Sequence, residues 1–349
     1  FVMDAYGIPF WVTVSITITL IWIYTFRGGI KTIVWTDTIQ TITMLGAVIL
    51  TIVAISNALD FDFSRLWSSV KDAGYTKIFF FEGGWNDTNN FFKQFIGGAL
   101  IATAMTGMDQ DMMQKNLTCR SLSSAQKNIY LFSVILVIAN FLFLFLGGLL
   151  YVYANDLGMT IPDKTDQLYP ILALTELPPY IGILFVIGLI AAAYSSADSA
   201  LTSLTTSFCV DFLGFETMEK SEQEKKSLRI KVHLGFSIIL LAIILIVNQL
   251  PNDAIINYLF RAAGYTYGPI MGLFVFSMLT NRNFRNKRSN SKADLPVIFI
   301  ALFAICLTVF LDLNSKVLLN GFTFGFTTLA INALFMIIGL YIFTKKESA

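Results

Sequence analysis

Hydroxyl and carboxylate side chains gather in one apolar stretch near the middle of the chain. On a helix, Ala192, Ser195, Ser196 and Ser199 share one face, and Asp198 lies at its border. Hydroxyl, carboxylate and main-chain carbonyl oxygens are hard ligands that suit a small alkali cation. Small residues also permit close helix packing, and serines also bond back to the preceding turn. The carboxylate in the same turn favours a cation site over packing alone.

Two other charged residues interrupt apolar stretches. Asp37, with Thr41 one turn later on the same face, is interpreted as a cation ligand or proton carrier. A favourable position near a helix N-terminus is the alternative for Asp37. Arg261 is interpreted as a counter-charge for an anionic substrate, because a guanidinium forks onto a carboxylate. Snorkelling toward the membrane surface and an internal pair with an Asp remain the alternatives for Arg261.

Glycines mark two places where helices are expected to pack closely or to loosen. Gly264, Gly268 and Gly272 repeat every four residues around Pro269, which predicts a close-packed helix face with a kink. In the segment 105–111, a glycine precedes three polar residues, which predicts a loosened helix end.

Composition identifies the surroundings of these residues. Of the 349 residues, 55% are hydrophobic and only 13% are charged, with a mean hydropathy of +0.67. Soluble domains carry about a quarter of their residues as Asp, Glu, Lys or Arg, so a soluble enzyme is excluded. The net charge of +1 argues against a nucleic-acid partner. No Walker A or HExxH motif occurs and His233 is the only histidine, so we expect a membrane protein in the lipid bilayer that is not an enzyme.

Nine stretches are long enough to cross about 30 Å of hydrocarbon as helices. They are 8–26, 32–56, 92–114, 128–153, 179–210, 232–250, 254–279, 294–311 and 322–343. With the residue 1 end outside, the cytoplasmic loops carry 17 Lys and Arg residues and the outer loops carry 6. This asymmetry predicts a multi-pass protein of the plasma (inner) membrane with a cytoplasmic C-terminus. Because Phe1 leads almost directly into a span, we expect the natural protein to be longer.

Five motifs, in the same order along the chain, make this sequence resemble the sodium:solute symporter family. They are Gly28-Gly29 through Trp35-Thr36-Asp37 to Gln40, Thr106-Gly107-Met108-Asp109-Gln110 through Gln114-Lys115, Ser121 to Lys127, Asp166-Gln167-Leu168-Tyr169-Pro170, and Ala193 to Ser199. Members of that family include sodium-coupled carriers of sugars, proline, pantothenate and sialic acid.

The resemblance implies an all-α polytopic fold with a LeuT-type core of two inverted five-helix repeats around a central site. On that plan, 1–56 are the last two helices of the first repeat and 57–91 are an extracellular loop. Residues 92–279 are then the second repeat, and 280–349 are two C-terminal accessory helices. The first three core helices are expected upstream of Phe1.

The resemblance also implies ligands for sodium. The carbonyl of Ala192 with Ser195 and Ser196 matches the main sodium site. A second site, present in only some members, is matched by Asp37, Ser199 and Asp198. Asp198 departs from the Ser or Thr of sugar and sialic-acid carriers, which adds a negative charge and allows either stronger cation binding or proton participation.

The substrate positions differ from those of the sugar carriers. Where those carriers have hydrogen-bonding side chains, this chain has Ala102, Met105, Thr106, Leu136 and Arg261. Few partners remain for the hydroxyls of a buried polyol, which argues against a neutral hexose. Arg261 favours an organic acid or sugar acid instead.

These features together indicate a secondary active symporter that imports a small organic solute with sodium as the coupling ion. Sodium would favour the outward-open state, and substrate binding would permit the change to the inward-open state. Proton coupling of the same fold through Asp37 or Asp198, a membrane solute sensor and a transport-incompetent remnant remain as alternatives.

Overall fold

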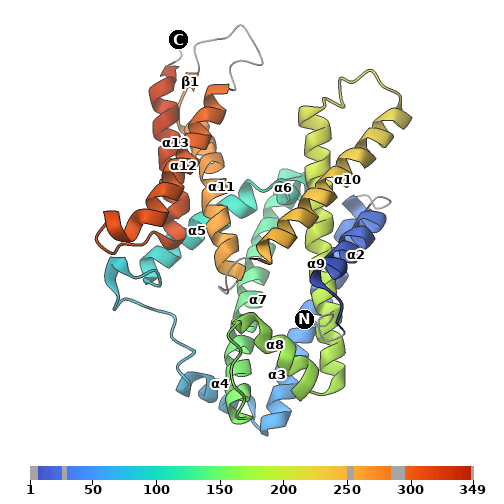
Figure 1. The fold of residues 1–349 in the computed structure, drawn as a ribbon, viewed down its shortest axis with the longest axis vertical. Helices are drawn as coiled ribbons and strands as arrows, with labels where there is room; N and C mark the ends of the chain where they lie inside the picture. Colours follow the sequence, from blue (N-terminus) through green and yellow to red (C-terminus); the bar gives the residue numbers. More distant parts are fainter. Residues whose placement is uncertain (1–6, 26–29, 250–254, 284–294, 347–349) are drawn as a thin grey trace. The chain divides into compact units, whose positions relative to one another are not determined.

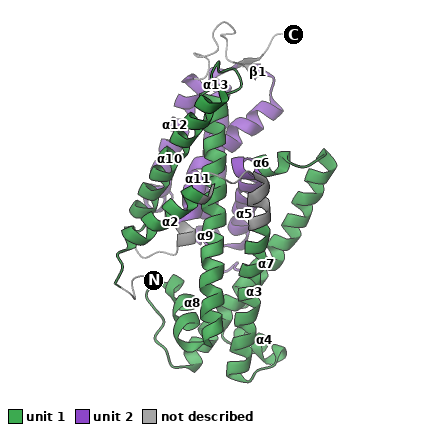
Figure 2. Ribbon diagram, turned by 90° about the vertical axis from the view of Figure 1, so that its right-hand side faces the viewer, with its two compact units in different colours: residues 1–76, 114–252 green, residues 77–113, 253–349 purple. Residues whose placement is uncertain are grey.

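The structure is a computed structural model, and it describes residues 7–25, 30–249, 255–283 and 295–346 (Figure 1). The chain forms two compact units, coloured separately in Figure 2. Unit 1 consists of residues 1–76 and 114–252, and unit 2 consists of residues 77–113 and 253–349. The predicted domains have other boundaries and stay a prediction, because repeat symmetry rather than compactness defines them.

Seven helices in the described part of the chain are long and apolar enough to cross a membrane. They are Asp37–Leu59, Leu122–Asp156, Pro179–Phe212, Glu222–Val247, Tyr258–Leu279, Leu295–Leu318 and Gly325–Phe343. Two of the nine expected spans differ. The stretch 8–26 forms α2 (Phe10–Thr25), a helix of 16 residues, and the stretch 92–114 is broken into two helices. Nine spanning helices are therefore not confirmed.

The break within 92–114 falls in the segment where the sequence predicts a loosened helix end. Helix α5 (Phe91–Gly107) ends at a glycine, and α6 (Gln110–Leu117) begins after Asp109. Asp109 Oδ1 accepts hydrogen bonds from the backbone N–H groups of Asp111 (3.0 Å) and Met112 (3.2 Å). This is an N-cap, which satisfies donors that the first helical turn leaves free. The cap starts α6, whose last turn carries Lys115.

Unit 1 is a bundle of long helices joined by short ones. Its helices are α2, α3 (Ile30–Leu59), α4 (Phe63–Asp72), α7 (Leu122–Asp156), α8 (Leu168–Ile171), α9 (Pro179–Ser207) and α10 (Glu222–Val247). Helix α9 packs along α3 (Figure 1). A Cβ atom at Gly188 of α9 would lie 3.6 Å from both Ala47 Cβ and Met44 Cα of α3. The small residues therefore let the two backbones approach closely.

Tyr169 explains why an aromatic residue stands in the Asp166–Pro170 motif. Its hydroxyl lies 2.8 Å from the hydroxyl of Thr51, a residue of α3 with 0% exposure. Its ring meets Phe185 of α9 edge to face, with the ring centroids 4.7 Å apart. The apolar ring and polar tip of one tyrosine thus join α8 to both helices of the α3–α9 pair.

Unit 2 is built around α11 and α13. It contains α5, α11 (Ile255–Leu279), α12 (Leu295–Leu318), α13 (Thr328–Phe343) and the short antiparallel strands β1 (Arg282–Asn283) and β2 (Lys345–Lys346). A Cβ atom at Gly272 of α11 would lie only 2.6 Å from the Ala333 carbonyl oxygen of α13. The glycine stripe of α11 is therefore a helix-packing face, as its spacing predicts.

Asn332 of α13 supplies a hydrogen-bond donor that helix α11 lacks at Pro269. Proline has no N–H, so the carbonyl of Tyr265, four residues earlier, loses its normal helical donor. Asn332 Nδ2 donates to that carbonyl at 2.8 Å and to the carbonyl of Gly264 at 3.2 Å. Asn332 is fully buried, with 0% exposure, so this amide satisfies backbone groups that water does not reach.

Candidate functional site

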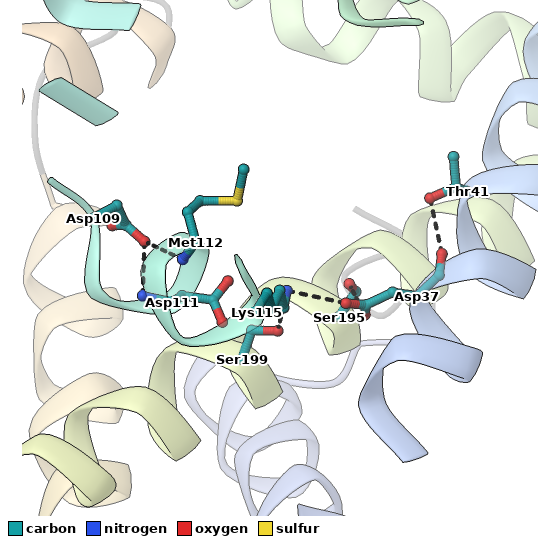
Figure 3. A network of polar contacts seen from close by, with 8 residues as sticks. All are labelled: Asp37, Thr41, Asp109, Asp111, Met112, Lys115, Ser195 and Ser199. Atoms are coloured by element: carbon teal, nitrogen blue, oxygen red, sulfur yellow. Dashed lines mark hydrogen bonds and ion pairs between the residues drawn. The ribbon is translucent and has the colours of Figure 1, made fainter. Parts of the chain in front are cut away.

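Asp37 of α3 and two serines of α9 converge on one position in unit 1 (Figure 3). The Ser195 hydroxyl donates to Asp37 Oδ1 at 2.5 Å. Asp37 Oδ2 accepts from the Lys115 ammonium at 3.1 Å, and that ammonium also donates to Ser199 Oγ at 2.9 Å. Asp37 therefore lies with Ser199, as the resemblance implies, and Ser195 joins the same group.

Lys115 is the member of this cluster that sequence reasoning did not select. It stands in the Gln114-Lys115 motif but is separated from Asp37 by 78 positions and from Ser199 by 84. Gln114 Nε2 donates to the backbone carbonyl of Ser203 on α9 at 3.4 Å, which ties this end of α6 to α9. The only sequence signal was a cation next to a motif glutamine.

The serine-bearing face of α9 carries oxygen atoms of the kind that bind small monovalent cations. Helix α9 is continuous from Pro179 to Ser207, so the Ala192 carbonyl accepts one helical hydrogen bond and keeps a second lone pair. The Ser195 hydroxyl donates a hydrogen bond to Asp37, so the lone pairs of the Ser195 oxygen remain available for a cation. Ser196 is exposed on the same face. Asp198, at the border of that face, is buried with 3% exposure.

Arg261 lines a cavity of about 540 Å³ that lies wholly within unit 2. The cavity is lined mainly by polar residues, among them Asn89, Gln94, Asp312 and Lys316. Within the described residues, the Arg261 guanidinium makes no hydrogen bond or ion pair. Asp312 Oδ2 instead accepts a hydrogen bond from the Tyr265 hydroxyl at 2.5 Å.

The other expected substrate residues lie on α5 and do not line the Arg261 cavity. Met105 packs against the core cluster of Ile101, Ala104 and neighbouring residues. Ala102 is exposed and Thr106 is half-buried, and both point away from Ala104, because two residues correspond to about 200° of helix rotation. The structure thus groups Ala102 and Thr106 on one face of α5 and separates them from Arg261.

Comparison with known proteins gives related carriers. A sequence model of the sodium:solute symporter family matches residues 1–288. A sodium/sialic acid symporter of Proteus mirabilis is 26% identical over 292 residues, which are 81% of this chain and 56% of that protein. The human sodium-coupled monocarboxylate transporter 1 is 25% identical over 283 residues, 78% of this chain and 45% of that protein. These relatives are named as transporters and not as enzymes.

The fold has a counterpart among solved structures. A Na⁺-coupled sialic acid symporter in a substrate-bound, outward-open state matches with a TM-score of 0.73 and 22% identity, over 98% of this chain and 69% of that one. The chain spans about half the length of the relatives it matches. The family match and the apolar helices together identify an integral membrane protein. The chain belongs to the sodium:solute symporter family.

Proposed function

We propose that this protein is a sodium-coupled symporter that imports a small organic acid or sugar acid by alternating access. The observation that carries the proposal is a polar cluster between α3 and α9: Asp37 accepts the Ser195 hydroxyl at 2.5 Å, and the Lys115 ammonium contacts Asp37 at 3.1 Å and Ser199 at 2.9 Å. Oxygens from two packed helices form a ligand set that a monovalent cation can bridge. Family membership supports sodium as the natural ion for this chemistry.

The residues proposed to hold sodium are the carbonyl of Ala192 and the hydroxyls of Ser195 and Ser196. The hydrogen bond from the Ser195 hydroxyl to Asp37 polarises the hydroxyl group, which makes the serine oxygen a better cation ligand. Bound sodium supplies positive charge at this face of α9. Coupling requires only that this face binds sodium more tightly in one conformational state than in the other.

An organic acid is the proposed substrate class because Arg261 lines a cavity and, among the described residues, no carboxylate is bonded to its guanidinium. A guanidinium in such a position can take a substrate carboxylate through two parallel hydrogen bonds. Two relatives are named for sialic acid and for monocarboxylates, both of which are carboxylic acids. Ala102, Met105 and Thr106 are proposed as further substrate contacts on α5.

The proposed location is the plasma (inner) membrane, with the residue 1 end outside and the C-terminus in the cytoplasm. The positive-inside asymmetry of the loops supports this orientation. It would make Asn89 and Lys316, which line the Arg261 cavity, residues of the outer side.

Sodium-specific thermal stabilisation of the full-length protein tests the proposal. Sodium is titrated against potassium and choline at constant ionic strength, in the wild type and in Ser196→Ala. Loss of one ligand should raise the half-saturating sodium concentration about tenfold, which corresponds to a loss of about 1.4 kcal/mol in binding free energy.

Ser133→Ala is the matched control, because the exposed Ser133 hydroxyl donates only to its own helix, at the Ile129 carbonyl. The control should keep the wild-type sodium response. An equal response to sodium, potassium and choline in the wild type would contradict sodium coupling.

A further inference from the structure

The second sodium position implied by the resemblance already holds a cation of the protein itself. The Lys115 ammonium lies 3.1 Å from Asp37 Oδ2 and 2.9 Å from Ser199 Oγ (Figure 3). Asp37 and Ser199 are two of the three residues expected to bind a second sodium ion. An ammonium and a sodium ion each carry one positive charge and each attract oxygen lone pairs, so the two compete for the same ligands.

Two of the three residues expected at this position, Asp37 and Ser199, already accept hydrogen bonds from the protein. Asp37 Oδ1 accepts the Ser195 hydroxyl, Asp37 Oδ2 accepts Lys115, and the Ser199 oxygen accepts the same ammonium. The single negative charge of Asp37 is balanced by the single positive charge of Lys115. A sodium ion added here would place two like charges a few ångströms apart, which is unfavourable in a sheltered site.

Hydrogen bonds hold the Lys115 ammonium in this position, and its side chain stays partly exposed to solvent. Its side chain is 27% exposed and that of Asp37 is 23% exposed, so the pair is sheltered from most of the solvent. The link from Gln114 to the Ser203 carbonyl keeps its end of α6 beside α9. The flexible four-carbon stem of lysine allows the ammonium to withdraw without a change in the backbone.

We propose that Lys115 is a tethered cation that fills the second site, so that sodium binds only at Ala192, Ser195 and Ser196. This inference rests on the proposed function. Lys115 also fixes Asp37 so that its other oxygen accepts the Ser195 proton, which orients the Ser195 lone pairs. Lys115 is therefore a specificity-determining residue: it sets the number of sodium ions and positions a ligand of the remaining one.

The test counts sodium ions in the full-length protein in detergent. Equilibrium binding of ²²Na⁺ gives the number bound per molecule, and the Hill coefficient of sodium-dependent thermal stabilisation gives an independent value. The Hill coefficient cannot exceed the number of sites, so we expect about one for the wild type. Lys115→Gln removes the charge and keeps a polar chain, and we expect about two bound sodium ions and a Hill coefficient above one.

Two control variants separate the charge of Lys115 from other effects. Lys115→Arg keeps the cation and should keep one bound sodium ion. Lys127→Gln removes an exposed lysine of the neighbouring helix α7 and should also keep one. If Lys115→Gln does not fold, the wild-type count still decides, because two bound sodium ions in the wild type would overturn the inference.

Each remaining outcome bears on one proposal or on both. One sodium ion in Lys115→Gln, with the fold intact, would overturn the tethered cation and leave sodium coupling standing. No sodium-specific binding in any of the four proteins would overturn the proposed function and this inference together.

Discussion

Units 1 and 2 each contain a cationic side chain among polar groups, and the surroundings of the two cations differ. In unit 1, the Lys115 ammonium contacts both Asp37 and Ser199. In unit 2, Arg261 lines a cavity of about 540 Å³. The carboxylate of Asp312, which lines the same cavity, accepts a hydrogen bond from the Tyr265 hydroxyl. One cation is satisfied by the protein, and the other faces space that a ligand can fill.

The contrast separates polar groups that stabilise the fold from polar groups that are available for binding. A charge with internal partners contributes to folding, and its removal leaves those partners unsatisfied. A charge that faces a cavity contributes little to folding and most to the capture of an opposite charge. The two cations should therefore respond differently to substitution.

Asp37→Ala should have the largest effect, because it breaks the satisfied site. Loss of the carboxylate removes charged hydrogen bonds to Lys115 and Ser195 and should lower the free energy of unfolding by about 2 kcal/mol. Thermal or denaturant unfolding measures this. Asp72→Ala, at an exposed position of α4, is the control and should change stability little. Equal stability of both variants would show that the cluster is not held by Asp37.

Asn332→Ala should destabilise unit 2 at its own satisfied polar contact. It leaves the Tyr265 carbonyl, which Pro269 deprives of a donor, without a partner, at an expected cost of about 1–3 kcal/mol. Unfolding of the full-length variant measures the loss. Asn314→Ala is matched, because Asn314 donates only to the Phe310 carbonyl of its own helix, and a loss as large as that of Asn332→Ala would refute the special role of Pro269.

Arg261→Gln should change substrate binding without changing the stability of the fold. We expect the half-saturating concentration of a transported carboxylate to rise about tenfold, which corresponds to about 1.4 kcal/mol. Stability should stay within about 0.5 kcal/mol of the wild type, as for an exposed substitution. Uptake assays and thermal unfolding on the same preparation measure both. A large loss of stability with unchanged affinity would reverse the assignment of Arg261.

The Thr51–Tyr169 pair should give the smallest effect. A double-mutant cycle with Thr51→Val and Tyr169→Phe should yield a coupling of about 1 kcal/mol, the net value of one neutral hydrogen bond. Denaturant unfolding of the two single variants and the double variant supplies the cycle. Strict additivity would mean that the 2.8 Å contact adds nothing to the packing of the two side chains.

Local features of the fold could be predicted from the sequence. The break between α5 and α6 follows from Gly107 and the capping residue Asp109, which act within a few residues. The packing face of α11 follows from the spacing of its glycines. Helix starts were less predictable: the apolar stretch 8–26 begins before the helix Phe10–Thr25, because hydropathy does not encode where a helix begins.

Long-range pairings could not be predicted in the same way. Asp37 was expected near Ser199 only through the resemblance, and its contact with Lys115 depends on how three helices pack. Asn332 carried a signal that could have been used. It is the only side-chain amide in the stretch 322–343, and Pro269 implies a carbonyl in need of a donor.

Solute accumulation by the full-length protein in proteoliposomes is the direct test of sodium-coupled import. A monocarboxylate, sialic acid and glucose are supplied with an inward sodium gradient, an inward potassium gradient or a pH gradient. We expect the sodium gradient alone to drive accumulation of at least one of the two acids above its equilibrium level, and we expect no accumulation of glucose. Accumulation driven by the pH gradient without sodium, or no accumulation of either acid, would contradict this expectation.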